Sequence, residues 1–212
     1  ANAAGTAPWG GALALCGDDH AAKSSTQAAQ SDQILIATGI PVLYPANVQD
    51  ILDFGVHAAL MSRAGGLWTA LKISAQVADG ASTARVHPDR LVPELIGRSP
   101  HVPSGRLLGA SLMEMERSLV ADRVPRALEY ARRNRINRIV VSSPDDRIGI
   151  VAAGKTYLDV RNALRLFGIG DDDLRRLGIR ILKLGMVYPL DPVIVHEFIG
   201  ATAEIGRASC RE

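Results

Sequence analysis

The stretch that decides the fold is Gly11-Ala12-Leu13-Ala14-Leu15-Cys16, which is followed directly by Gly17-Asp18-Asp19-His20. An apolar run of this length, closed by a glycine and two carboxylates, predicts a buried β-strand that ends in a polar loop. In open α/β sheets ligands bind at that end, because the loops leaving the carboxyl ends of the strands line the crevice. The sequence therefore predicts an α/β protein with a candidate site directly after this strand.

The loop that follows this strand is unusually polar up to residue 32 and supplies the candidate site residues. His20 can act as an acid, a base or a hydrogen-bond donor near neutral pH, and is the candidate catalytic residue. The hydroxyl and amide side chains can orient a carboxylate or a ring nitrogen. The candidate pocket-lining residues are Asp18, Asp19, Ser24, Ser25, Thr26 and Gln30. The alternative is that the two aspartates cap a helix suggested by Ala21-Ala22-Lys23, and that the hydroxyl groups form turn hydrogen bonds.

Length and composition limit the classes to which the chain can belong. Its 212 residues suffice for one large domain or two small ones, and 47% hydrophobic with 22% charged residues is typical of globular proteins. A net charge of +2 does not indicate a nucleic-acid or membrane partner. No apolar run approaches the roughly 18 residues that span a bilayer. The two cysteines, Cys16 and Cys210, form neither a disulfide framework nor a cluster site, so we expect a reducing, cytoplasmic setting.

The first half of the chain alternates between strand and helix signals. Residues 42–44 predict a short strand, and Asn47 predicts the N-cap of an amphipathic helix over 48–63 that stops at Gly65-Gly66. Residues 67–77 predict another buried strand, with Trp68 in the core. Frequent proline and glycine over 79–108 predict a linker on the surface.

A helix is expected from Pro125 to Asn134, with the proline in its first turn. Its basic end suits the negative pole of the helix dipole, and a solvated face is the preferred interpretation over an anion site. The residues of this basic end are Arg132, Arg133, Arg135 and Arg138.

From residue 138 onward strands and helices alternate, which predicts a mainly parallel sheet with helices on both faces. The helix after the second strand is expected to carry Val160, Ala163, Leu164 and Phe167 on one face. Asp171 is expected to cap a short helix, and Asp191-Pro192 to start the last one. The carboxylate clusters at 145–146 and 171–173 are interpreted as turn and cap residues, with no metal site.

Residues 149–156 formally satisfy the P-loop pattern, a glycine and four residues followed by Gly-Lys-Thr. A P-loop needs a flexible turn after the strand, whereas Gly149 falls inside the predicted strand 148–151. A nucleotide-binding module is therefore an alternative interpretation and not the leading one. His57 is expected to be packed, and His87, His101 and His196 to lie in linker and helix surface.

Two ordered blocks of the sequence resemble the 2-oxoacid:ferredoxin oxidoreductases, most of all the fused indolepyruvate ferredoxin oxidoreductase type. The first block resembles the back half of a pyrimidine-binding domain, and the second a transketolase C-terminal-like domain. The segments of the first block are 1–6, Gly10-Gly11, 13–15, 17–20, 24–26, Gln30-Ser31, 41–46 and 48–53. Those of the second are 149–151, 154–161, Gly185-Met186 and Pro189-Leu190.

The resemblance implies an α/β fold made of a truncated thiamine-diphosphate-binding (pyrimidine-type) domain followed by a transketolase C-terminal-like parallel α/β domain. The expected parts are residues 1–84, a linker and helix over 85–137, and a truncated second domain over 138–203. Residues 204–212 equal one reading frame of a common sequencing adaptor, and we expect them to be an artefact outside the fold.

The resemblance also implies an activity for the intact protein. Such enzymes use thiamine diphosphate with Mg²⁺ and 4Fe-4S clusters to decarboxylate a 2-oxoacid, acylate coenzyme A and reduce ferredoxin. It implies that the loop after the first strand borders the aminopyrimidine and substrate pocket. The activating glutamate, the magnesium–diphosphate motif and the cluster cysteines do not appear here. We therefore expect a fragment that is inactive alone, whose partners are the rest of the polypeptide and, when intact, a second copy, without nucleic acid or membrane. A catalytically inert scaffold derived from the family is a further alternative.

Overall fold

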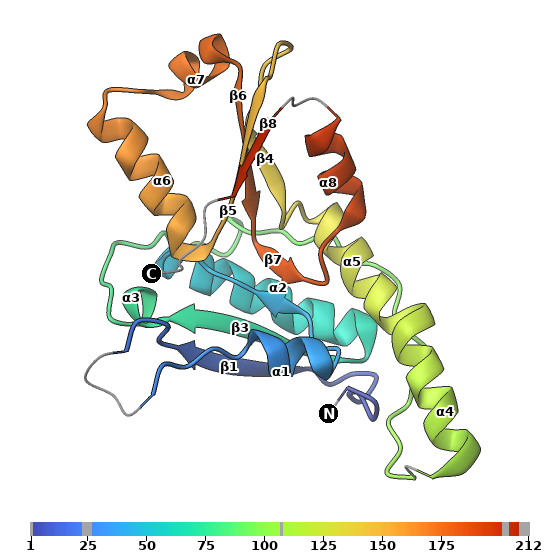
Figure 1. The fold of residues 1–212 in the computed structure, drawn as a ribbon. Helices are drawn as coiled ribbons and strands as arrows, with labels where there is room; N and C mark the ends of the chain where they lie inside the picture. The colour runs from blue at the N-terminus through green and yellow to red at the C-terminus, as the bar shows by residue number, and fades with distance from the viewer. Residues whose placement is uncertain (1, 23–26, 107, 201–203, 208–212) are drawn as a thin grey trace.

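Two four-stranded β-sheets organise the chain in a computed structural model that describes residues 2–22, 27–106, 108–200 and 204–207 (Figure 1). Sheet A holds the three strands of the first half of the chain together with β7 (Met186–Tyr188) from the second half, and sheet B holds the other strands of the second half. Among the described residues, no helix has both the length and the apolar character needed to cross a bilayer. The prediction of an α/β fold is confirmed.

Sheet A has the strand order β1-β3-β2-β7. Its strands are β1 (Ala12–Asp18), β2 (Val42–Leu43), β3 (Trp68–Ser74) and β7 (Met186–Tyr188). The first three run parallel, and β7 pairs antiparallel with β2. β1 is therefore an edge strand, and the expectation of a fully buried strand is wrong, since Leu15 is 68% exposed. Trp68, which was expected in the core, begins β3 and is 37% exposed.

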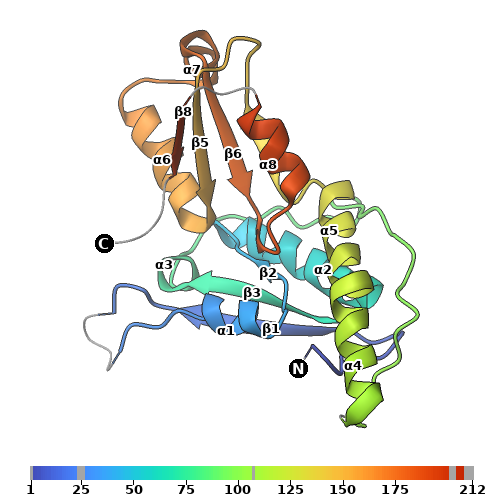
Figure 2. The same cartoon turned by 45° about the vertical axis from the view of Figure 1, so that its right-hand side comes forward.

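Side chains point alternately to the two faces of sheet A along each strand, so both faces carry apolar groups that a helix covers. Helix α2 (Val48–Gly65) packs with Leu43 and Leu71 on one face. The short helix α1 (Asp32–Ala37) places Leu35 against Val42 and Ala70 on the other (Figure 2). The predicted limits of α2 are confirmed. The Asn47 side chain accepts a hydrogen bond from the backbone of Asp50, and Gly66 ends the helix in the left-handed conformation.

After the short helix α3 (Ala75–Ala78), the described residues up to 106 form neither helix nor strand, as expected for a linker. Two of them are buried, however. His101 donates from Nε2 to the carbonyl oxygen of Ala4 at 2.8 Å, so its assignment to the surface is wrong. Ser99 binds the backbone of α2 through its amide. The linker thus closes part of the core.

The helix expected at residues 125–134 is the end of a much longer helical segment. This segment comprises α4 (Gly109–Ser118), a π-helical turn (Leu119–Arg123) and α5 (Val124–Arg133). Pro125 lacks an N–H group and its ring would clash with the carbonyl four residues earlier. The π-helical turn widens the hydrogen-bond ladder at that point, so the helix continues through the proline. The prediction that the helix begins at this proline is therefore wrong.

Sheet B has the strand order β4-β6-β5-β8. Its strands are β4 (Arg138–Val141), β5 (Ile148–Ala153), β6 (Ile179–Leu184) and β8 (Glu204–Arg207). β5, β6 and β8 are parallel and β4 is antiparallel to β6, so the prediction of a mainly parallel sheet is confirmed. The link from β4 to β5 is too short for a parallel crossover. Residues 204–207, expected outside the fold, form its edge strand; their origin as an artefact stays a prediction.

Helices lie on both sides of sheet B (Figure 1). These are α6 (Gly154–Leu166), α7 (Asp171–Leu177) and α8 (Pro192–Ile199). Phe167, expected on the packed face of α6, is 82% exposed. Gly170, not Asp171, is the N-cap of α7, and its amide donates to the carboxylate of Asp173.

The two sheets are tied together by buried polar contacts. Lys183 on β6 donates to the Asp50 carboxylate on α2 at 2.6 Å, and both side chains are buried. The Asn137 side-chain oxygen accepts from the amides of Gly185 and Met186, which holds the turn into β7. Strand β7 therefore belongs to sheet A although its neighbours in sequence belong to sheet B.

Candidate functional site

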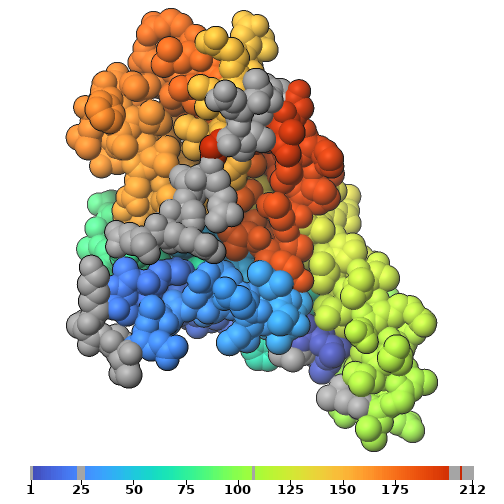
Figure 3. All heavy atoms as spheres, in the orientation of Figure 1, coloured from blue at the N-terminus to red at the C-terminus, as the bar shows by residue number. Residues whose placement is uncertain are grey.

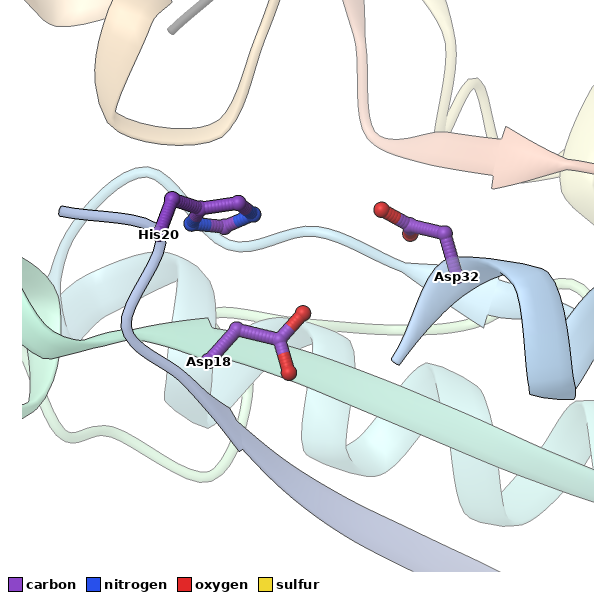
Figure 4. Close-up of side chains that lie close together, drawn as sticks. All are labelled: Asp18, His20 and Asp32. Atoms are coloured by element: carbon purple, nitrogen blue, oxygen red, sulfur yellow. The ribbon is translucent and has the colours of Figure 1, made fainter. Parts of the chain in front are cut away.

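The candidate site lies where β1 and β3 end, at the carboxyl edge of sheet A. Register pairs Cys16 with Lys72 and Asp18 with Ser74, so all four side chains stand on the same face, the one that α1 covers. Figure 4 shows the side chains of Asp18, His20 and Asp32 pointing toward one space above this edge. The two described ends of the polar loop, at Asp18–His20 and at Asp32, thus lie close together at this edge of the sheet.

A buried lysine organises this space. The Lys72 ammonium group donates to Asp32 and lies 3.6 Å from the Asp18 carboxylate. It also lies 4.9 Å from the centre of the Tyr44 ring, a cation–π distance. Burying an ammonium group is costly unless it is paired and hydrogen-bonded, and here two carboxylates and one aromatic face meet that requirement.

Asp18 joins the lysine to the start of α1. Its carboxylate accepts hydrogen bonds from the Ser31 amide at 3.0 Å and from the Ser31 hydroxyl at 2.6 Å. Ser31 is the N-cap residue of α1. The alternative in which Asp18 caps a helix at Ala21-Ala22-Lys23 is wrong on this point, because the carboxylate binds the N-cap residue of α1, which begins only at Asp32.

The protonation of neighbouring groups follows from this packing. Burial raises the pKa of the Asp32 carboxyl, but the hydrogen bonds from Lys72 and Gln30 outweigh it, so the net pKa is lowered and Asp32 is a carboxylate at neutral pH. Burial, and then the charge of Asp18, raise the pKa of the Cys16 thiol. Cys16 is therefore a protonated, unreactive thiol and not a nucleophile.

Three ligand atoms of the metal-binding type come close together here, one each from Asp18, His20 and Asp32. They all lie within 4.8 Å of one another. The ammonium group of Lys72 lies against both carboxylates, offsets one of their two negative charges, and would repel a divalent cation. The cluster is therefore better described as a carboxylate–ammonium network than as a metal centre.

The other residues predicted for the site are distributed around this network. His20 is half-buried beside Asp18 and Asp32, whereas Gln30 is exposed and donates to Asp32 at 2.9 Å. The carbonyl oxygen of Asp19 accepts from the amide of Ala29 at 2.9 Å and closes the loop. Ser24, Ser25 and Thr26 lie outside the described residues.

Sequence analysis missed Lys72, Asp32 and Ser74 as site residues. A lone lysine within an otherwise apolar strand was the available signal, since lysine is almost never fully buried unless it is paired. Ser74 is also buried, and its hydroxyl has no hydrogen-bond partner among the described residues. A buried polar atom without a partner requires an explanation. The Ser74 hydroxyl is such an atom, and Ser74 is paired with Asp18 at this strand end.

Tyr44 connects this network with the end of β5. Gly154 begins α6 with a φ angle of +52°, and a Cβ atom on it would lie 2.5 Å from the Tyr44 ring. The same ring faces Lys72 on sheet A. The carboxyl ends of the strands of sheet A and of β5 therefore meet at one aromatic side chain.

The P-loop interpretation fails at this place. Strand β5 continues to Ala153, so Gly149 is a strand residue and no phosphate-binding turn follows it. The Tyr44 ring covers Gly154, and Lys155 forms an ion pair with Asp159 one helical turn away. Residues 148–159 thus form an ordinary strand-to-helix junction.

Comparisons with known proteins agree on one family. Residues 138–205 match the model of the indolepyruvate oxidoreductase domain. The fold resembles that of a solved 2-oxoglutarate:ferredoxin oxidoreductase from Magnetococcus marinus, with a TM-score of 0.61 and 14% identity over 97% of this chain and 42% of that one. The chain therefore has a fold similar to part of this 2-oxoglutarate:ferredoxin oxidoreductase.

More particular relatives are found among curated proteins. The indolepyruvate oxidoreductase subunit IorA of Methanothermobacter thermautotrophicus is 26% identical over 92% of this chain. The IorA subunit of Methanothermobacter marburgensis is 25% identical over 89%. The chain spans 30% and 29% of the length of these relatives. The resemblance is confirmed: the chain is related to 2-oxoacid oxidoreductases of the indolepyruvate type.

Proposed function

We propose that this chain is part of a thiamine-diphosphate-dependent oxidoreductase that oxidatively decarboxylates an aryl 2-oxoacid of the indolepyruvate kind. The product would be an acyl-CoA, with electrons passed through 4Fe-4S clusters to ferredoxin. In this proposal the chain supplies one wall of the cofactor and substrate pocket, and the intact protein is a cytoplasmic homodimer. The rest of the same polypeptide supplies the activating glutamate and the Mg²⁺–diphosphate site.

The observation that carries the proposal is the carboxylate–ammonium network of Asp18, Lys72 and Asp32 at the strand ends. A network of buried charges costs stability compared with an apolar core, so its presence at a sheet edge favours a functional role. It lies where open α/β sheets bind ligands, and relatives with the same fold act on 2-oxoacids.

The polar groups at this edge suit an aminopyrimidine ring. The free lone pairs of Asp18 and Asp32 can accept from an exocyclic amine, while His20 and the unpaired hydroxyl of Ser74 can donate to a ring nitrogen. Thiamine diphosphate, when bound, supplies the electron sink for the decarboxylation. The residues of this chain would orient the ring and hold a proton at His20, and Lys72 would fix both carboxylates in place.

The experiment begins with the complete open reading frame from the same DNA. The intact protein is produced with its cofactors, and oxoacid-dependent reduction of a viologen dye is measured. Lys72→Met should lower kcat by about a hundredfold, the effect of a displaced positioning group. Lys155→Met is the matched control, since Lys155 pairs only with an exposed carboxylate on its own helix, and should keep full activity. Full activity in Lys72→Met would refute the proposed role of the network.

The separate expectation of inactivity is tested with the chain alone. Residues 1–203 should show no oxoacid-dependent dye reduction, because the activating glutamate is not among them. Reduction above the buffer rate by this chain would contradict the division of the active site between this chain and the rest of the polypeptide.

A further inference from the structure

A cavity lies away from the candidate site, between α5, β4 and α8. Its volume is about 550 Å³, which is within the range of small-molecule sites. Figures 1 and 2 show α5 and α8 side by side at this end of sheet B. One wall is aliphatic and consists of Ala131, Ile139, Val193 and Ile194.

The other wall carries three arginines, of which one is paired with a carboxylate and two are not. Arg132 is committed to Asp191, to which it donates twice, at 2.7 and 3.2 Å, while Asp191 caps α8. Arg135 and Arg138 also line the cavity, and in the described part of the chain their side chains have no hydrogen bond or ion pair. Two guanidinium groups are therefore available to an anion at the rim.

A buried donor lies at this side of the cavity. Asn137 lines the cavity and is 7% exposed. Its oxygen accepts from two backbone amides of the turn into β7, which fixes the orientation of the amide group. Its nitrogen then has no partner among the described residues. This nitrogen has almost no accessible surface, so the arginines, and not Asn137, are the groups that a ligand in the cavity would meet.

Charge and surface type together select the class of ligand. The lining holds three arginines and two acids, Asp191 and Glu197, so its net charge is one positive unit. A multiply charged anion would meet the Glu197 carboxylate, whereas a single carboxylate matches the excess charge. The planar fork of an arginine binds a carboxylate with two parallel hydrogen bonds. The aliphatic wall requires an apolar body on the same molecule.

We propose that this cavity binds a small organic monocarboxylate with an apolar body, whose carboxylate is held by Arg135 and Arg138 and whose body lies against Val193 and Ile194. The site is separate from the carboxylate–ammonium network and does not depend on the proposed function. It also changes the interpretation of the basic end of α5, which the sequence alone assigned to a solvated helix end.

The test is a calorimetric titration of the full 212-residue chain with phenylacetate. Saturable binding is expected. Arg135→Gln and Arg138→Gln should each weaken it roughly three- to tenfold, and Glu197→Gln should strengthen it. Arg85→Gln changes the net charge equally at an exposed linker position and should leave affinity unchanged. Val193→Trp fills the cavity from a half-exposed helix position, keeps both arginines and should abolish binding.

Two further ligands separate the alternatives. Benzyl alcohol has the same body without the charge, and inorganic phosphate has charge without the body; both should bind more weakly than phenylacetate. Absence of saturable phenylacetate binding would overturn the proposal. Equal binding of benzyl alcohol would also overturn it, because the cavity would then bind apolar molecules without regard to charge. Equal binding of phosphate would do the same, because the arginines would then bind any anion. Circular dichroism of each variant shows whether a loss of binding reflects a loss of fold.

Discussion

The substitution Lys72→Met tests how much the buried charge network costs when it is broken. Lys72 is 4% exposed, and the Asp18 side chain beside it is fully buried, so the variant leaves a buried carboxylate without its counter-charge. Breaking a buried pair in this way costs about 3–5 kcal/mol. Asp18 keeps both hydrogen bonds from Ser31, and Asp32 is partly exposed, so we expect a value near the lower limit, about 3 kcal/mol.

For a chain of this length, about 3 kcal/mol corresponds to a decrease in Tm of roughly 6–12 °C. Thermal and urea unfolding at pH 7, followed by circular dichroism, measure it. Lys155→Met is the control and should change stability by less than about 0.5 kcal/mol. The double variant Asp18→Asn, Lys72→Met removes both charges and should recover part of the loss. A Lys72→Met variant as stable as the parent chain would show that the network is solvated and would refute the reasoning.

The network also predicts a pH dependence. The folded-state pKa of Asp32 is lowered by Lys72 and Gln30, despite burial, so its contribution is fully present above the unfolded value of 3.8. The contribution is lost as the pH falls through the lowered folded-state pKa. The stability difference between the parent chain and Lys72→Met should therefore shrink in acid. A difference that stays constant from pH 7 down to acid unfolding would exclude Asp32 as its source.

Three further predictions concern stability. Gly154→Ala places a Cβ against the Tyr44 ring at a positive φ and should lower the free energy of unfolding, measured in urea, by at least about 2 kcal/mol. Gly168→Ala, at a similar φ but in open space, is the control and should lower it by about 1 kcal/mol. Equal losses in the two variants would contradict the contact with Tyr44. Burial lowers the pKa of His57, so stability should fall as the pH drops below about 6.5, and His57→Gln should flatten this profile if burial is the cause. Arg123→Met removes a fully buried guanidinium that binds four backbone carbonyls and should cost about 3 kcal/mol, an effect that Arg123→Lys should only partly restore; a loss below about 1 kcal/mol would be inconsistent with those bonds.

Features set by local chemistry were predictable from the sequence. The Asn47 cap, the Gly66 end of α2 and the Asp191-Pro192 start of α8 depend on residues within one helical turn, and all three are confirmed. The packed state of His57 follows from its place on the apolar face of α2, and it bonds the Tyr130 hydroxyl at 3.1 Å. Such signals need no knowledge of the rest of the fold.

Features set by distant parts of the chain were not predictable. Whether β1 is central or at an edge depends on its neighbours in the sheet, and an apolar run reads the same in both cases. The role of Lys72 emerges only from the register that places β3 beside β1 and from the loop that returns Asp32. The helix before Pro125 was missed because the π-helical turn that accommodates the proline has no sequence signature.

The pairing of β2 with β7 has a consequence for how the protein is made. Val42 lies opposite Tyr188, so β2 and β7 join two segments that are far apart in the chain and leave the ribosome at different times. Until β7 emerges, β2 presents an unpaired edge to the solvent, and closing so long a loop is slow. The edge of β2 must therefore be kept from aggregating until β7 has been made, and a stop before residue 186 releases a product in which sheet A lacks β7.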